Sequence, residues 1–138
     1  MEKNEPPDVL TNQEIVELYN NFDYKHRGLS ATAFIEAAQK PNTIIFDLRP
    51  IDRYQLGHIK GAVHLGADVT IEKLNQLAPD YNSTILVYCS NSLEPTRMVP
   101  LTHTIAPQIY GLGYKNIYFL DAAWRDKEVI PWEGKIKK

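Results

Sequence analysis

The sequence predicts a three-layer α/β/α domain, in which helices cover both faces of a central parallel sheet of about five strands. Short apolar runs rich in β-branched residues alternate along the chain with segments whose apolar residues recur at helical spacing. This order is typical of strand–helix–strand units, whose crossover connections join parallel strands. The 138 residues, 43% of them hydrophobic, suit one domain with an ordinary core.

The apolar runs and the helical segments can be assigned in chain order. The predicted strands are residues 43–48, 62–65, 84–88 and 117–120. The predicted helices are residues 11–22, 30–38, 71–77 and 101–110, with a short helical turn at 52–56. Thr11 and Glu14 form a capping-box pattern at the start of the first helix. Residues 1–10 are predicted to be a flexible leader to a single domain at 11–138, and the polar stretch 23–28 is predicted to be irregular.

Charge and composition argue against several classes of function. The net charge is −2 with both signs interspersed, so no nucleic acid partner is expected. No stretch approaches 18 consecutive apolar residues, so no membrane span is expected. The polar first residues do not resemble a signal peptide, which favours a cytoplasmic protein; a mature exported domain without its signal is the alternative. One cysteine and no close histidine pair predict no metal site, and no cofactor is expected.

The only cysteine, Cys89, follows directly on the strand predicted at 84–88. Ligands of open parallel sheets bind beyond the carboxyl ends of the strands. A loop that leads from a strand end into a helix presents backbone N–H groups to an anion and favours a reactive thiolate. The alternative is a buried structural cysteine, because free cysteine is among the residue types most often buried. The residues expected to bind substrate in this loop are Ser90, Asn91, Ser92, Leu93, Glu94 and Arg97.

A second pattern favours the reactive cysteine. Residues 47–49 are Asp-Leu-Arg, and residues 54–62 follow the pattern Tyr-x-x-Gly-His-Ile-x-Gly-Ala. Val-Tyr-Cys at 87–89 and Gly-Tyr-Lys-Asn-Ile at 113–117 stand at the spacing that accompanies these motifs. Together they resemble the rhodanese-like family, and the resemblance extends from residue 29 to residue 132. It implies the rhodanese-like fold and sulfurtransferase chemistry.

The resemblance also implies a role for individual residues. Cys89 falls on the cysteine that forms a persulfide in this family, so it is the expected catalytic residue. Arg53 matches a position that helps some sulfurtransferases to hold an anionic donor such as thiosulfate. Asp47 and Arg49 match a pair that makes structural charge contacts near the site. The two other residues expected to be structural near the site are His58 and Trp124.

The segment after Cys89 departs from the family pattern. In the usual sulfurtransferase the loop closes within five residues of the cysteine, often on an arginine, and relatives that act on phosphate or arsenate have a Cys-x5-Arg pattern. Here the first arginine is Arg97, eight positions after Cys89, and Pro95 and Pro100 lie on either side of it. Ala122-Ala123 also replaces the usual double glycine before Trp124. These differences predict an enlarged loop or a helix that begins late, and they put ordinary thiosulfate sulfurtransferase activity in question.

The leading hypothesis is a sulfurtransferase or sulfur carrier without a cofactor. The Cys89 thiolate takes sulfane sulfur from a small anionic donor such as thiosulfate or a polysulfide, and a thiol or protein acceptor that the sequence does not identify removes it. Arg53 and Arg97 are expected to orient the donor. The alternative is a rhodanese-like module that binds a protein or senses redox state with little turnover, which the long loop favours. A phosphatase or arsenate reductase is the third hypothesis, although phosphate requires a tight cradle with a well-placed arginine.

Overall fold

The computed structural model describes residues 10–93, 100–121 and 127–134, and its centre is a parallel sheet of five strands. The strands stand in the order β1-β6-β5-β2-β4, and every neighbouring pair is parallel. The strand bounds are β1 (Gly28–Leu29), β2 (Thr43–Asp47), β4 (Val63–His64), β5 (Thr84–Tyr88) and β6 (Ile117–Leu120). A second, antiparallel pair joins β3 (Gly57–Ile59) to β7 (Trp132–Gly134). The prediction of a parallel sheet of about five strands is confirmed.

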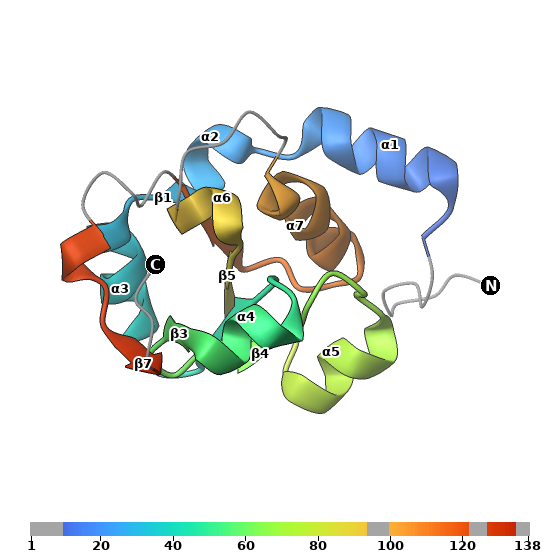
Figure 1. Cartoon of the computed structure of the whole chain (residues 1–138). Coiled ribbons are helices and arrows are strands. Elements are labelled where there is room, and N and C mark those ends of the chain that lie inside the picture. The colour runs from blue at the N-terminus through green and yellow to red at the C-terminus, as the bar shows by residue number, and fades with distance from the viewer. Residues whose placement is uncertain (1–9, 94–99, 122–126, 135–138) are drawn as a thin grey trace.

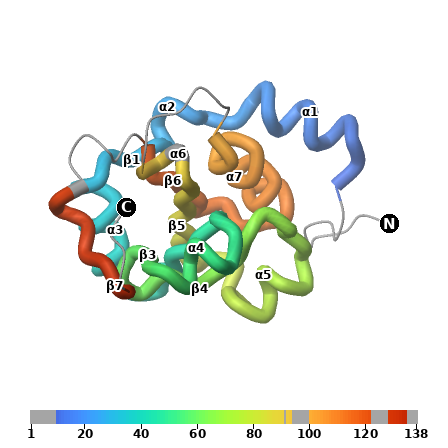
Figure 2. Tube along the Cα trace, in the orientation of Figure 1, coloured from blue at the N-terminus to red at the C-terminus, as the bar shows by residue number. Residues whose placement is uncertain are grey.

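Helices cover both faces of this sheet, as Figure 1 shows. Their bounds are α1 (Asn12–Asn21), α2 (Tyr24–Arg27), α3 (Ala31–Ala38), α4 (Ile51–Leu56), α5 (Ile71–Leu77), α6 (Ser90–Leu93) and α7 (Leu101–Gly111), with a 3₁₀ helix η2 (Lys127–Val129). Helices α5 and α7 pack on one face, and α1 lies against α7. Helix α3 packs on the other face, next to the β3–β7 pair. The trace in Figure 2 follows the same arrangement without ribbons.

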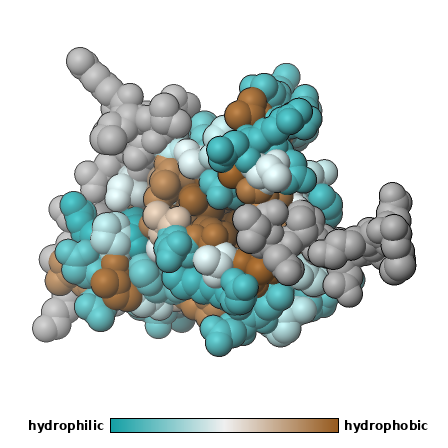
Figure 3. Space-filling model, turned by 90° about the vertical axis from the view of Figure 1, so that its right-hand side faces the viewer, coloured by the Kyte–Doolittle hydropathy of each residue, from teal (hydrophilic) through white to brown (hydrophobic). Residues whose placement is uncertain are grey.

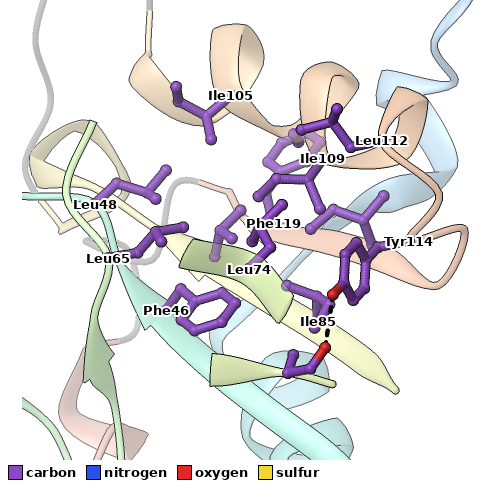
Figure 4. Close-up of a cluster of buried hydrophobic side chains, with 14 of the residues drawn as sticks. Phe46, Leu48, Leu65, Leu74, Ile85, Ile105, Ile109, Leu112, Tyr114 and Phe119 are labelled. Atoms are coloured by element: carbon purple, nitrogen blue, oxygen red, sulfur yellow. Dashed lines mark hydrogen bonds between the residues drawn. The ribbon is translucent and has the colours of Figure 1, made fainter. Parts of the chain in front are cut away.

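Two hydrophobic clusters form the core, one on each face of the sheet. Side chains of successive strand residues alternate between the faces, so Phe46, Ile85 and Val87 belong to the cluster under α5 and α7. Figure 4 shows this cluster, to which Leu48 and Ile105 also belong. Figure 3 shows the side of the molecule that is on the right in Figure 1, where apolar residues lie among polar ones in the middle of the surface.

The N-terminal segment confirms one local prediction and corrects another. The capping box at Thr11 is present, because its hydroxyl accepts the Glu14 N–H and the Glu14 carboxylate accepts the Thr11 N–H. The prediction that 23–28 is irregular is wrong: this stretch holds α2 and the first residue of β1. Asp23 caps α2 by accepting the His26 N–H. Two-residue β1 is too short for any alternation of apolar residues to reveal it.

The remaining predicted elements lie close to their expected bounds, and β5 and α5 coincide with them. The pairing of β3 with β7 brings together residues more than seventy positions apart, which no local pattern indicated. Residues 1–9 of the predicted leader are outside the described residues, and Leu10 packs against the cluster under α7. Among the described residues, no helix has both the length and the apolar character that crossing a membrane requires.

Candidate active site at the carboxyl edge of the sheet

Cys89 lies where the sequence predicted it, directly after the carboxyl end of β5. The register pairs Asp47 with Tyr88, and the Leu48 N–H donates to the Tyr88 carbonyl at 2.9 Å, so the ends of the two central strands are held together. Alternation turns the Cys89 side chain toward the cluster under α7, where it is 2% exposed. Leu48, Leu65 and Ile105 belong to the same cluster (Figure 4). The sulfur therefore occupies an apolar environment at the edge where ligands of such sheets bind.

A short turn of helix, α6, continues the chain from Cys89 and folds back on it. The Cys89 N–H donates to Ser92 Oγ at 3.2 Å, and the Ser92 N–H donates to the Cys89 carbonyl at 3.1 Å. Ser92 Oγ is also 3.9 Å from Cys89 Sγ. These two amides are occupied within the loop and do not point to an anion, and the anion-binding cradle that the sequence suggested stays a prediction for the other N–H groups of the loop. Ser90 is exposed, whereas Leu93 is buried in the cluster on the opposite face.

A buried polar network supports the strand ends from the other face of the sheet. The Asp47 carboxylate accepts hydrogen bonds from the Arg49 N–H and from the Arg49 guanidinium, with a shortest distance of 2.7 Å. It also accepts the Tyr88 hydroxyl at 2.6 Å, and that hydroxyl accepts the Ile59 N–H at 3.0 Å. Arg49 Nη2 further donates to the Gly57 carbonyl at 2.6 Å. The network thus connects β2, β5 and β3.

The charges in this network balance, although every member is buried. Asp47 is 0% and Arg49 3% exposed, so each ion depends on the other for the interactions that water would provide. Burial lowers the pKa of Arg49, but its hydrogen bonds to Asp47 and the charge of that carboxylate outweigh burial and leave the pKa raised. Burial, and next the Asp47 charge, raises the pKa of Tyr88. Tyr88 therefore stays a hydrogen-bond donor to Asp47 under all ordinary conditions.

His58 makes local contacts of the kind expected for a structural residue. Its ring stacks on Tyr54 with 3.9 Å between the ring centroids and 8° between the planes. Its Nδ1 lies 2.8 Å from the Tyr54 carbonyl, and its Nε2 lies 3.6 Å from a carboxylate oxygen of Glu133 in β7. The same oxygen accepts the Gly61 N–H at 2.6 Å. His58 therefore links α4 to β7, and Glu133 links β7 to the turn after β3.

Arg53 lies on α4, which begins three residues after Leu48 and therefore starts at the same edge of the sheet as Cys89. Its side chain is exposed. The backbone of Asn91 lies in α6, while Glu94, Arg97 and Trp124 lie outside the described residues, so their predicted roles stay predictions. Within the described residues, no group of three or more potential metal-ligating side chains lies together.

Tyr88 is the member of this region that the sequence analysis did not single out. Its position next to Cys89, at the end of a buried strand, could have indicated that its hydroxyl takes part in a buried hydrogen bond. A tyrosine on the inner face of a central strand must find a partner for its hydroxyl, and its register with Asp47 supplies one. That register depends on long-range strand pairing, which the sequence alone does not give.

A sequence model of the rhodanese-like domain matches residues 30–126, which is more than half of the chain. The chain belongs to the rhodanese-like domain family. This confirms the resemblance drawn from the Asp-x-Arg and Gly-His-Ile motifs. The matched region of this rhodanese-like domain begins at the N-cap of α3, so α1, α2 and β1 lie before it.

Solved structures with the same fold include rhodanese-like proteins from bacteria. The rhodanese-like domain of the Alr3790 protein from Anabaena sp. is 20% identical with a TM-score of 0.60, covering 80% of each chain. A rhodanese with anions from E. coli is 20% identical with a TM-score of 0.52, covering 67% of this chain and 99% of that one. EanB, in a complex with hercynine, is 20% identical with a TM-score of 0.61, covering 80% of this chain but 28% of its own. At these identities the likeness establishes the rhodanese-like fold.

Proposed function

We propose that this rhodanese-like protein is a sulfurtransferase or sulfur carrier that holds sulfane sulfur as a persulfide on Cys89. The observation that carries the proposal is the position of Cys89 directly beyond β5, at the carboxyl edge of a parallel sheet in a chain of this family. No other cysteine exists in the sequence, so any sulfur relay through a thiol of this chain must use Cys89.

The proposed transfer requires no external oxidant or reductant. The Cys89 thiolate attacks the outer sulfur of thiosulfate and forms a new S–S bond. The old S–S bond breaks, and sulfite leaves with its electron pair. An acceptor thiolate then attacks the outer sulfur of the persulfide, forms its own S–S bond and releases the Cys89 thiolate. Charge balances at each step, and the cysteine ends in its starting state.

Two arginines are proposed to orient an anionic donor. Arg53 lies on α4, a helix that starts at the same edge of the sheet as Cys89, and its side chain is exposed. The role of Arg97 is proposed from its position in the sequence alone. A guanidinium binds an oxyanion through paired hydrogen bonds, so loss of either arginine should weaken the use of thiosulfate. The use of a polysulfide should fall less, because a polysulfide has no oxygen atoms to accept these hydrogen bonds.

The proposal predicts that Cys89 gains one sulfur atom when the folded protein is incubated with thiosulfate or a polysulfide. The gain is measured as an increase in intact mass, reversed by a thiol reductant. Cys89→Ser is the control and should show no gain, because it leaves no thiol in the chain. Arg53→Ala should slow loading from thiosulfate more than loading from polysulfide. Absence of any mass gain from either donor would overturn the proposal.

A second candidate function is a protein-binding module with little turnover. It is favoured by the 2% exposure of Cys89, which limits the access of a small donor to the sulfur. This function predicts that Cys89 of the folded protein resists both sulfur donors and a small alkylating reagent. Rapid alkylation followed by sulfur loading would exclude it as the main role.

A further inference from the structure

Ser92 is the polar side chain that contacts Cys89 in the part of the chain that the structure describes. We propose that its hydroxyl donates a hydrogen bond to the Cys89 sulfur and thereby stabilises the thiolate and persulfide forms. This inference rests on the proposed sulfur-transfer function and adds a residue that controls its rate.

The direction of the hydrogen bonds around Ser92 Oγ supports this assignment. A serine hydroxyl has one hydrogen to donate and two lone pairs to accept with. The Cys89 N–H donates to Oγ at 3.2 Å, so that contact uses a lone pair and leaves the hydroxyl hydrogen free. Cys89 Sγ lies 3.9 Å from Oγ. Once the thiol has lost its proton the sulfur can only accept, and the hydroxyl is then the donor.

The surroundings of the sulfur make such a donor important. Cys89 belongs to the apolar cluster that includes Leu48, Leu65 and Ile105 (Figure 4), and these side chains offer no hydrogen bond. A thiolate in an apolar environment is unfavourable unless a donor compensates for the lost water. The amides of Cys89 and Ser92 are already engaged within the loop. The Ser92 hydroxyl supplies the hydrogen-bond donor to the sulfur that those amides do not supply.

The position of Ser92 is also fixed before any reaction occurs. Its side chain is 3% exposed, and its own N–H donates to the Cys89 carbonyl at 3.1 Å. Two hydrogen bonds in opposite directions therefore join Cys89 and Ser92 through backbone and side chain. A donor held in this way needs little reorganisation when charge develops on the sulfur.

The test compares Ser92→Thr with Ser92→Val, because threonine and valine have the same shape and differ in the hydroxyl. Rates of persulfide loading from polysulfide and of alkylation by iodoacetamide are measured on proteins shown to be folded by circular dichroism. Ser92→Val should be slower than Ser92→Thr by about tenfold in both reactions, as expected for loss of one hydrogen bond to a charged group. Ser92→Ala should be slow for the same reason.

Ser83 provides the matched control. It is also buried, its hydroxyl donates to Asn42 at 2.9 Å, and it precedes β5 at the opposite edge of the sheet. Ser83→Ala should leave both rates unchanged. Equal rates for Ser92→Thr and Ser92→Val would overturn the inference and leave Ser92 as a spacer. If the wild-type protein takes up no sulfur, the proposed function fails, whereas the alkylation rates still decide whether Ser92 stabilises the thiolate.

Discussion

At the scale of single residues, the reactive cysteine and the polar network that supports it lie on opposite faces of the sheet at its carboxyl edge. Cys89 points into the apolar cluster under α7, while its neighbour Tyr88 points to the opposite face and meets Asp47 and Arg49. The backbone that carries the cysteine is thus anchored, on the side away from the sulfur, by a buried hydrogen-bond network that contains the Asp47–Arg49 ion pair. Such a network is costly to disturb, because each partner removed leaves another unsatisfied.

Tyr88→Phe tests this anchoring. The substitution leaves the buried Ile59 N–H without its acceptor and removes one of the three hydrogen bonds that Asp47 Oδ2 accepts. We expect the free energy of unfolding to fall by about 1–3 kcal/mol, measured by urea denaturation. Tyr118→Phe is the control, because the Tyr118 hydroxyl makes no hydrogen bond to the described residues and the loss should stay below about 0.5 kcal/mol. Equal losses in the two variants would refute the anchoring role.

At the scale of elements, the antiparallel β3–β7 pair lies next to the buried network of Asp47, Arg49 and Tyr88. Gly57 pairs with Gly134, and the Gly57 carbonyl accepts the Arg49 guanidinium. Gly134 has φ of +111°, and a Cβ atom there would stand 2.5 Å from Gly57 Cα and 2.7 Å from the Leu56 carbonyl oxygen. Both are backbone atoms, which cannot move aside as a side chain can. The close approach of the two strands therefore requires glycine at this position.

Two substitutions, Gly134→Ala and Gly61→Ala, distinguish the cost of a steric clash with the backbone from the cost of a positive φ. Both glycines have positive φ, but a Cβ at Gly61 would meet no atom within 4 Å. Gly61→Ala should lower the free energy of unfolding by about 1–2 kcal/mol, the cost of a left-handed alanine. Gly134→Ala adds the clash and should cost clearly more, together with faster amide exchange in β3. If both variants lose the same stability in denaturation experiments, strain alone accounts for Gly134.

The contrast between predicted and missed elements has a physical basis. Strand 84–88 and helix 71–77 have strong local patterns, and both occur with the predicted bounds. Elements β1, β3 and β7 have two or three residues each and are defined by partners far away in sequence, so local periodicity could not indicate them. The stretch 23–28 was misjudged because its helix has only four residues, too few to show helical periodicity, although Asp23 caps it locally.

The candidate site was predictable in outline and not in detail. The apolar run at 84–88 located Cys89 at a strand end, and the family resemblance implied charge contacts of Asp47 and Arg49, which form an ion pair in the structure. The hydrogen bond from Cys89 to Ser92 and the bridge from Tyr88 to β3 depend on side-chain orientations that only the folded backbone fixes. The expected cradle of free amides assumed an open loop, whereas α6 folds back and engages two of those amides itself.

At the scale of the whole molecule, the segment before the matched family region covers the outer side of α7. Helix α1 lies against α7, and α2 brings Tyr24 to the first turn of α7, where its hydroxyl donates to the His103 carbonyl at 3.1 Å. The His103 ring packs 5.0 Å from the Tyr24 ring and 4.9 Å from the Phe119 ring of β6. This imidazole therefore stands where α2, α7 and the sheet meet.

His103 should make the stability of the whole fold depend on pH below neutrality. Burial among Tyr24 and Phe119 lowers the pKa of His103, although the charge of Asp121 opposes this in part. A histidine whose pKa is lower in the folded state than its ordinary value of about 6.5 binds a proton more readily when unfolded. Its neutral form therefore contributes stability that is complete above pH 6.5 and is lost as the pH falls through the folded-state value.

His103→Phe keeps an aromatic ring in this position and removes the titrating group. The free energy of unfolding, measured by urea denaturation across the range from neutral to mildly acidic pH, should fall less steeply for this variant than for the wild type. His103→Leu packs differently but lacks the same proton, so its absolute stability should differ while its pH dependence matches that of His103→Phe. Parallel curves for the wild type and both variants would show that this imidazole does not link protonation to folding, and that the acid sensitivity of the domain comes from its carboxylates and other histidines.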